Sequence, residues 1–312
     1  MGLIRSPESD PVLAQFAADV GPEGPVTIRG GGTHWDVGGL PDPGAREISP
    51  PAGIIGIRAD EMTVEVRAGT LVTDLHAALK PLGQRTALPE LLGATVGGII
   101  SLGWSGIAAL GRGQIRDSVL QIHYVSAEGE LVTAGGPTVK NVSGFDVCRI
   151  LVGSLGTLGC LGDVILRTRP IPEVEEWHRL DDIDPSKVLE MCATSASLLW
   201  DGHSTWVLSA GYKADVDADL SVLGKLGTVV SDGPPDLPPH RWSRRPADLA
   251  GMSNGDARAG RFVAEIGVGM VHSENPVPSP VLPSGVLALG KRVKDAFDPN
   301  GRFNPGRTLG RP

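Results

Sequence analysis

Short strand-like and helix-like apolar patterns follow one another in the first part of the chain. Residues 53–70, GIIGIRADEMTVEVRAGT, contain two apolar runs separated by Ala-Asp-Glu, which predicts a β-hairpin. In residues 71–79 apolar side chains recur at i, i+1, i+4, i+7 and i+8, which predicts the buried face of a helix. His76 falls off this face and is predicted to be solvated, and Gly83 is predicted to end the helix.

A second hairpin is predicted further along the chain. Apolar and polar residues alternate in SVLQIHYVSAEGELVTAGG, residues 118–136, with a turn at Glu128-Gly129. His123 lies on the polar side of this pattern and is predicted to be an ordinary strand residue. A further strand is predicted over residues 163–169.

Three glycine-rich segments interrupt these elements: RGGGT at 29–33, a long stretch at 91–117, and GSLGTLG at 153–159. Consecutive glycines cost conformational entropy, so a sequence that keeps them needs positive φ angles or a ligand lying against the backbone. In RGGGT, successive N–H groups can form an anion-binding nest beside the Arg29 charge and the Thr33 hydroxyl. A tight turn between strands is the alternative interpretation.

Two familiar phosphate-binding motifs are excluded by spacing. The chain has no Walker sequence, and the prolines in HWDVGGLPDPG, residues 34–44, prevent the helix that a Rossmann fingerprint requires after its glycines. The 91–117 segment has too many glycines for a regular helix and too many apolar residues for a surface loop. Buried irregular backbone needs partners for its N–H groups, so the three segments together predict one long ligand such as a dinucleotide.

Composition narrows the class of protein. At 312 residues and 32.5 kDa the chain is long enough for two lobes. The net charge of −8, with no basic cluster larger than RWSRR at 241–245, argues against nucleic acid as a partner. No signal-peptide h-region and no apolar run of about 18 residues is present, which predicts a cytoplasmic protein without direct membrane insertion. The cysteines, Cys148, Cys160 and Cys192, lack ligand spacing and are predicted to be reduced core residues.

The order of the motifs resembles one family. RGGGT, GATVGGIIS (93–101), VKNVSGFD (139–146), GSLGTLG and the closing KDAFDPNGRFNPGR (294–307) are similar to the motifs of the FAD-binding oxidoreductases of the vanillyl-alcohol oxidase superfamily, also called PCMH-type. Within it the FAD-binding subunits of glycolate oxidase are the most similar. The resemblance covers residues 24–172 and 286–307 and is weak between them.

This resemblance implies an α+β fold. Two α/β subdomains are expected to form a PCMH-type FAD-binding domain over residues 1–172. A small α+β cap (substrate) domain is expected over residues 173–285, and a C-terminal segment, 286–312, is expected to return to the FAD-binding domain.

The resemblance also implies FAD as the cofactor. Its pyrophosphate is expected on residues 29–33 and 93–98, its flavin ring near residues 101–106, and its adenosine end near residues 156–161. The residues expected to contact FAD are Arg29, Gly30, Gly31, Gly32, Thr33, His34, Gly93, Ala94, Thr95, Gly97, Gly98, Ser101, Ser105, Gly106, Gly156, Gly159 and Leu161.

Non-covalent binding of FAD is expected. Some relatives attach flavin covalently through a histidine four residues after the arginine, whereas His34 is five residues after Arg29 and Thr33 holds the fourth place. Covalent attachment through His34 is therefore the alternative. Trp104 replaces the small residue usual in the family, which either narrows access to the flavin or fills core.

Candidate catalytic residues come from the middle of the chain. GVGMVH, residues 267–272, resembles the G-D-G-N-L-H motif of catalytic 2-hydroxy-acid dehydrogenases, with Val268 and Met270 in place of the acidic and amide residues. His272 is a candidate to accept the hydroxyl proton while hydride passes to FAD, and a histidine that ends a core strand is the alternative. His240 and Arg241 are candidates to grip a substrate carboxylate, or they lie in a solvated loop. No histidine or carboxylate spacing indicates a metal site.

Two classes of function follow. In the first, the chain is the FAD-binding subunit of a glycolate oxidase-like complex that oxidises a small 2-hydroxy acid. In the second, it binds FAD but only relays electrons or scaffolds a catalytic partner; a standalone oxidase of an alcohol or sugar is a further alternative. Three scattered cysteines cannot hold an Fe–S cluster, so a sister flavin subunit and an iron-sulfur subunit are the expected partners.

Overall fold

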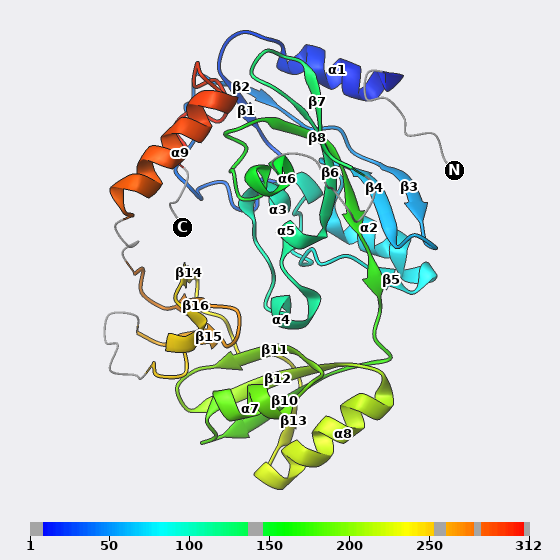
Figure 1. Cartoon of the computed structure of the whole chain (residues 1–312), viewed down its shortest axis with the longest axis vertical. Coiled ribbons are helices and arrows are strands. Elements are labelled where there is room, and N and C mark those ends of the chain that lie inside the picture. The colour runs from blue at the N-terminus through cyan, green and yellow to red at the C-terminus, as the bar shows by residue number, and fades with distance from the viewer. Residues whose placement is uncertain (1–8, 137–145, 253–259, 278–281, 309–312) are drawn as a thin grey trace. The chain divides into compact units, whose positions relative to one another are not determined.

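The computed structural model describes residues 9–136, 146–252, 260–277 and 282–308; most of the VKNVSGFD motif lies outside them. The chain forms two compact units, and Figure 1 labels their elements. The first unit comprises residues 1–104, 115–170 and 281–311, and the second comprises 105–114 and 171–280. Residues 105–114 thus belong to the second unit, although they fall inside the range predicted for the FAD-binding domain.

A five-stranded antiparallel sheet is the centre of the first unit (Figure 1). In spatial order its strands are β3 (Ile54–Arg58), β4 (Thr63–Arg67), β8 (Cys160–Arg167), β6 (Val119–Val125) and β7 (Leu131–Gly135). The pairs β3–β4 and β6–β7 are the two predicted hairpins. The first unit also contains two separate two-stranded sheets. In one, β1 (Val26–Ile28) runs parallel to β2 (Arg46–Ile48), and in the other, β5 (Gln84–Arg85) runs antiparallel to β9 (Arg169–Pro170).

One face of this sheet builds the main core. Alternate strand residues such as Val64, Ile122 and Val164 point to the same face, where they pack with α2 (Val72–Leu79), α3 (Val96–Leu102) and α6 (Val147–Leu151). The predicted helix over 71–79 is therefore present, and Gly83, at φ 65°, follows the short 3-10 turn that ends it. The remaining helices of the unit are α1 (Pro11–Val20), α5 (Ile115–Ser118) and α9 (Ser284–Phe297).

The opposite face carries a buried polar network rather than solvated side chains. Asp163 accepts hydrogen bonds from His123 at 2.6 Å and Arg67 at 3.2 Å, and Arg67 also pairs at 2.6 Å with Asp10, the N-cap of α1. The sequence pattern placed His123 on the correct face of β6. It predicted an ordinary polar-face residue, whereas the side chain is buried, with only 3% of its surface exposed. Glu65 lies near His123 and Asp163 in the same cluster.

His76 also differs from its prediction. Its ring is not solvated: Nδ1 lies 2.6 Å from a Glu90 carboxylate oxygen and Nε2 lies 2.8 Å from the Thr86 hydroxyl. Thr86 is fully buried. The imidazole therefore ties α2 to the segment that follows it.

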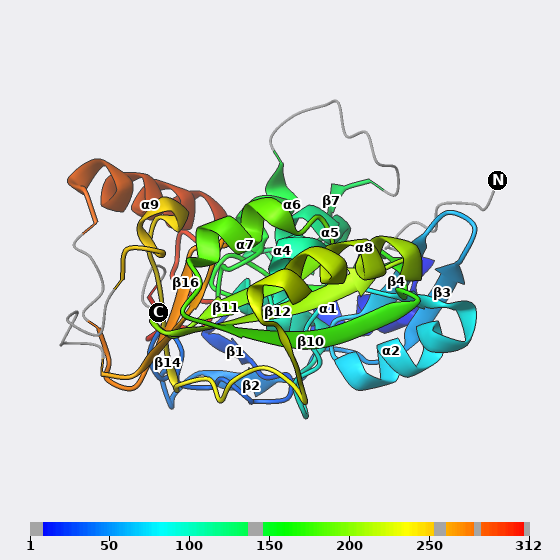
Figure 2. The ribbon, with the colours of Figure 1, turned by 90° about the horizontal axis from the view of Figure 1, so that it is seen from below.

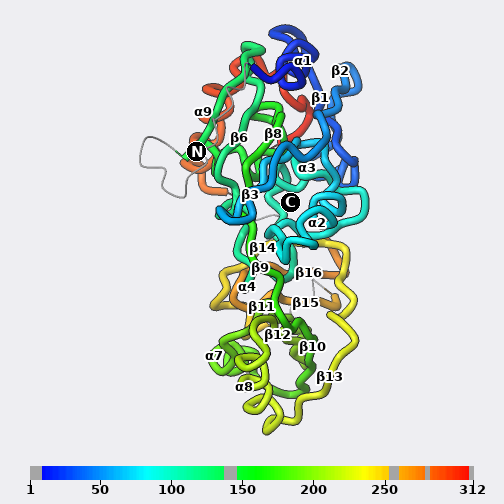
Figure 3. Tube along the Cα trace, turned by 90° about the vertical axis from the view of Figure 1, so that its right-hand side faces the viewer, coloured from blue at the N-terminus to red at the C-terminus, as the bar shows by residue number. Residues whose placement is uncertain are grey.

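The second unit is built on a seven-stranded sheet covered on one side by α7 (Pro185–Met191) and α8 (Lys213–Leu223) (Figure 2). The trace in Figure 3 shows both helices on the same side of this sheet. In spatial order the strands are β13 (Val229–Ser231), β10 (Val174–Asp181), β12 (Ser204–Gly211), β11 (Ser195–Trp200), β15 (Phe262–Glu265), β16 (Met270–Ser273) and β14 (His240–Ser243). Both units mix helices and strands, which confirms the predicted α+β class.

The 91–117 segment is more regular than predicted. It contains α3, α4 (Ala109–Arg112) and α5, separated by glycines. Gly103 ends α3 in the left-handed region, at φ 65°. In the second unit Gly111 of α4 lies against β11, where an added Cβ would come within 2.6 Å of the Ala196 Cα. Glycine here permits short helices and close packing rather than a wholly irregular chain.

All three cysteines are buried and free, as predicted. Burial raises the pKa of Cys148 and of Cys192 to about 11, and raises that of Cys160 further. Because the thiolate is the reactive form, we expect a thiol reagent at pH 8 to label none of them in the native protein and all three in urea. Rapid labelling of the native chain, followed by mass spectrometry, would contradict this assignment.

Among the described residues, no helix combines the length and the apolar character needed to cross a membrane.

Candidate functional site

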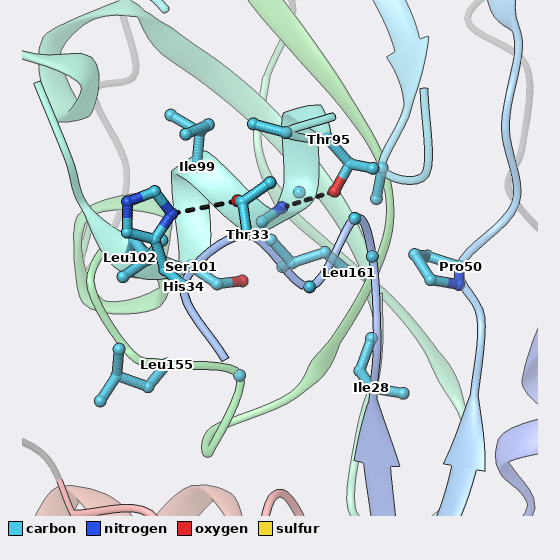
Figure 4. A pocket seen from close by; sticks show the side chains of 18 of the residues that line it. Ile28, Thr33, His34, Pro50, Thr95, Ile99, Ser101, Leu102, Leu155 and Leu161 are labelled. Atoms are coloured by element: carbon cyan, nitrogen blue, oxygen red, sulfur yellow. Dashed lines mark hydrogen bonds between the residues drawn. The ribbon is translucent and has the colours of Figure 1, made fainter. Parts of the chain in front are cut away.

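A pocket in the first unit gathers four segments that are far apart in the sequence. They are the loop after β1, the start of α3 with the loop before it, the loop before β8, and the C-terminal segment. The space between these segments, counted with its open mouth, measures about 700 Å³. Figure 4 shows side chains from the first three of these segments around the same space.

Most of the predicted FAD-contacting residues line this pocket. Those that do are Gly30, Gly31, Gly32, Thr33, His34, Ala94, Thr95, Gly97, Gly98, Ser101, Gly156, Gly159 and Leu161. Arg29 and Gly93 are adjacent to the lining in sequence but not part of it. Ser105 and Gly106 belong to the second unit and do not line the pocket. Nine lining residues were not predicted: Ile28, Trp35, Pro50, Ala68, Ile99, Leu102, Leu155, Asn304 and Arg307.

The glycines of this pocket are required by the close approach of two loops. A Cβ added at Gly31 would lie 1.7 Å from the Gly93 carbonyl oxygen, and one added at Gly30 would lie 2.2 Å from the Thr95 hydroxyl oxygen. Gly97 meets Ala68 of the neighbouring β-strand region in the same way, at 2.7 Å. Residues 30–32, 97 and 98, all glycines, line the cavity and have no side chains to cover their backbone, which suits a long ligand that carries phosphates.

Local polar contacts fix the loops. Thr95 is the N-cap of α3 and accepts a hydrogen bond from the Gly98 N–H at 3.2 Å. His34 Nδ1 lies 3.0 Å from the Thr33 hydroxyl, as Figure 4 shows. The Trp104 ring meets the His34 ring edge-on, with centroids 4.3 Å apart. Trp104, which stands where the resemblance leads one to expect a small residue, thus packs on His34.

Two arginines flank Trp35 at the pocket. The guanidinium of Arg29 lies 4.9 Å from the centre of the Trp35 ring, and that of Arg307 lies 4.8 Å from it. Arg307 also donates to the Trp35 carbonyl at 2.8 Å. Burial lowers the pKa of Arg307, and the nearby Asp36 partly opposes this. The stack brings two positive charges to a pocket with few other ionisable groups.

The C-terminal segment forms one wall of the pocket through Asn304. This side chain is 3% exposed; its oxygen accepts from the Ile28 N–H at 3.0 Å, and its amide nitrogen donates to the Leu155 carbonyl at 2.7 Å. The Asn304 N–H donates to the Val26 carbonyl at 2.8 Å. One asparagine therefore joins β1, the loop before β8 and the C-terminal segment.

In the second unit, His272 and Arg241 lie together on neighbouring strands. They are directly opposite each other in the β14–β16 pair. His272 Nε2 lies 2.9 Å from a carboxylate oxygen of Glu265, and an Arg241 Nη atom lies 3.7 Å from the same oxygen. Arg241 also donates to the Ser105 carbonyl at 3.0 Å. Burial lowers the pKa of Arg241, while the Glu265 carboxylate acts against this shift.

The predicted pairing of His240 with Arg241 is wrong in this structure. Both residues belong to β14, where consecutive side chains point to opposite faces, and His240 is exposed. The two side chains cannot grip one carboxylate together. Arg241 instead meets His272 and Glu265, and Glu265 is the polar residue of this cluster that the sequence analysis missed.

Among the described residues, one cluster has the composition of a metal site: Glu65, His123 and Asp163, whose ligand atoms lie within 4.8 Å of one another. The Asp163 carboxylate is already hydrogen-bonded to His123 and Arg67. These bonds account for the cluster as a structural network.

Comparisons with known proteins support FAD as the ligand of this pocket. A family model described as FAD binding domain matches residues 13–135. The chain is 26% identical over 236 residues to the glycolate oxidase subunit GlcE of Escherichia coli (strain K12), covering 69% of this chain and 64% of that protein.

Two other curated relatives match a shorter part of the chain. The glycolate oxidase subunit GlcD of Bacillus subtilis (strain 168) is 30% identical over 156 residues, and a D-lactate dehydrogenase of Archaeoglobus fulgidus is 34% identical over 148 residues. These matches cover 49% and 47% of this chain and 33% of each relative. The chain thus spans about two thirds of one relative and about one third of the others.

A solved structure extends the similarity to the fold of nearly the whole chain. An alkyldihydroxyacetonephosphate synthase superposes with a TM-score of 0.67 at 15% identity, covering 94% of this chain and 72% of that one. At this identity the similarity concerns the fold alone.

Proposed function

Because this chain belongs to the FAD-binding (PCMH-type) oxidoreductases of the vanillyl-alcohol oxidase superfamily, we propose that it is the FAD-binding subunit of a glycolate oxidase-like complex. In this proposal the complex oxidises a small 2-hydroxy acid and passes the electrons to a partner. The observation that carries it is the glycine-lined pocket, whose predicted contacts converge in three dimensions, together with similarity to GlcE over 236 residues.

The residues of the pocket fit FAD. The glycine backbone of residues 30–32 and 97–98 lines the pocket without side chains and would face the pyrophosphate. Arg29 and Arg307, held on Trp35, would supply positive charge nearby. His34 is held by Thr33 and Trp104, which supports a polar contact rather than a covalent link to flavin.

For the chemistry, bound FAD supplies the acceptor for the hydride of the substrate C–H bond. His272 is proposed to take the hydroxyl proton. Arg241 is proposed to hold the substrate carboxylate, since guanidinium groups bind carboxylates in a bidentate manner. In this arrangement the protein orients the substrate and removes one proton.

A partner is needed for the next step. The three buried cysteines are too few for an Fe–S cluster, so electrons are proposed to leave through a sister flavin subunit and an iron-sulfur subunit. A relay role without catalysis is the second candidate, and the replacement of the motif's acidic and amide residues by Val268 and Met270 favours it.

The test is anaerobic reduction of the FAD-loaded full-length chain by glycolate or D-lactate, followed by flavin absorbance. Bleaching supports catalysis, and the variant His272→Asn is then expected to react about 100-fold more slowly while retaining FAD. Flavin that stays oxidised with every 2-hydroxy acid would favour the relay role, and equal rates in the variant would remove His272 from the mechanism.

A further inference from the structure

Three polar side chains share one face of the sheet in the second unit. In the strand order β15–β16–β14, His272 is paired with Val263 on one side and with Arg241 on the other. Glu265 lies two residues beyond Val263 on β15, so it points to the same face and is a diagonal neighbour of His272. The residues between them on these strands, such as Phe262, Ala264 and Val271, point to the opposite face and pack into the core of this unit.

Glu265 and His272 are both deeply buried. Their side chains are 1% and 6% exposed, and His272 Nε2 lies 2.9 Å from Glu265 Oε1. Glu265 Oε2 is buried and has no hydrogen-bond partner among the described residues. A buried carboxylate is costly unless it is paired, and a buried polar atom without a hydrogen-bond partner requires an explanation.

The charge next to this pair is positive. Arg241 approaches Glu265 Oε1 at 3.7 Å and is itself held by the Ser105 carbonyl at 3.0 Å. Its side chain is 19% exposed, so it is the most accessible member of the cluster. With a neutral imidazole, the Glu265 and Arg241 charges offset each other, and the cluster carries no net charge.

We propose that Glu265 is the positioning residue of His272: its carboxylate accepts the Nε2–H and thereby leaves Nδ1 as the nitrogen that takes the substrate proton. This inference rests on the proposed function. When the substrate O–H bond breaks, the proton would move to Nδ1, and bound FAD would accept the hydride, with its two electrons, from the C–H bond. The carboxylate then faces an imidazolium, whose positive charge it stabilises. Glu265 touches neither substrate nor FAD in this account.

One test reads the tautomer of His272 without any turnover. The full-length FAD-loaded chain is labelled with ¹⁵N-histidine, and the signal of His272 is identified by its loss in His272→Asn. We expect the neutral ring of the wild type to carry its proton on Nε2. In Glu265→Gln, where the amide can donate as well as accept, we expect a mixture of tautomers. A wild-type ring protonated on Nδ1, or an unchanged tautomer in the variant, would overturn the proposal.

The second test reads the rate of flavin reduction. Glu265→Gln is expected to lower the rate at saturating substrate about 10- to 100-fold, with KM changed less than about twofold, because the interaction acts in the transition state. The control is Glu176→Gln, which removes an exposed carboxylate 3.8 Å from another buried histidine of the same sheet, His178. It is expected to react like the wild type.

The rates of flavin reduction distinguish a failure of the proposed function from a failure of the role proposed for Glu265. A wild-type flavin that no 2-hydroxy acid reduces contradicts the proposed function. A wild type that is reduced, with Glu265→Gln reduced equally fast, contradicts only the role of Glu265. Loss of FAD from the variant would also contradict it, because a positioning residue for His272 has no part in holding the cofactor.

Discussion

Gly31→Ala is expected to abolish binding of FAD under ordinary assay conditions. The added Cβ would lie 1.7 Å from the oxygen and 2.8 Å from the carbon of the Gly93 carbonyl. Both obstacles are backbone atoms, so no side-chain rotation relieves the clash, and the two loops must separate. Overpacking of this kind costs about 3 kcal/mol or more, which corresponds to about 100-fold or more in affinity.

The measurement is titration of the apoprotein with FAD, followed by quenching of flavin fluorescence. The matched control is Gly56→Ala in β3, where nothing lies within 4 Å of the added Cβ and φ is not positive. We expect the control to bind like the wild type. Full affinity for FAD in Gly31→Ala would mean that the loops at Gly31 and Gly93 do not approach each other as described. It would contradict the assignment of this pocket as the FAD site.

Arg67→Met is expected to cost about 3–5 kcal/mol of folding stability, since it leaves buried carboxylates without their cation. Arg67 is 6% exposed and bridges Asp10 at 2.6 Å and Asp163 at 3.2 Å. Urea unfolding at pH 7 measures the loss. The control is Arg149→Met, which removes an arginine whose partners Asp117 and Asp146 are about half exposed, and we expect it to change stability by less than about 1 kcal/mol.

The same variant has a predictable dependence on pH. Burial raises the pKa of Asp10, but the hydrogen bond from Arg67 and those from the Val12 and Leu13 amides outweigh it and hold the pKa below its usual value. A lowered pKa stabilises the native state above the unfolded pKa of about 3.9, and this stability is lost as the pH falls through the folded-state pKa. The difference between wild type and Arg67→Met is therefore expected to narrow below about pH 4. A constant difference down to pH 2 would contradict the described network.

Local patterns predicted the elements better than the environments of their polar residues. Alternation placed His123 on the correct face of β6, but its partner Asp163 is 40 residues away on β8, so no local pattern could show that this face is covered. His76 was missed for the same reason, because its partners Thr86 and Glu90 follow the helix that carries it.

The glycine motifs predicted most of the pocket because each marks backbone that lies close to another part of the chain, as Gly31 does to Gly93 and Gly97 to Ala68. Trp35 and Arg307 gave no such signal, since their stacking joins residues 272 positions apart. Glu265 could have been found: the glycines at 267 and 269 indicate a turn. A hairpin around that turn brings Glu265 and His272 onto one face.

Asn304 has a consequence for the order of events during synthesis. Its side chain joins β1 to the loop before β8, and the Arg302 carbonyl accepts from the Val26 N–H. The pocket near the start of the chain is thus completed by residues made nearly 280 positions later. A nascent chain still lacking residues 302–307 has the glycine loops but not their closing wall, so stable capture of FAD is expected only after residues 302–307 have been made. Premature termination within this short stretch would leave a chain that has both glycine loops and no cofactor.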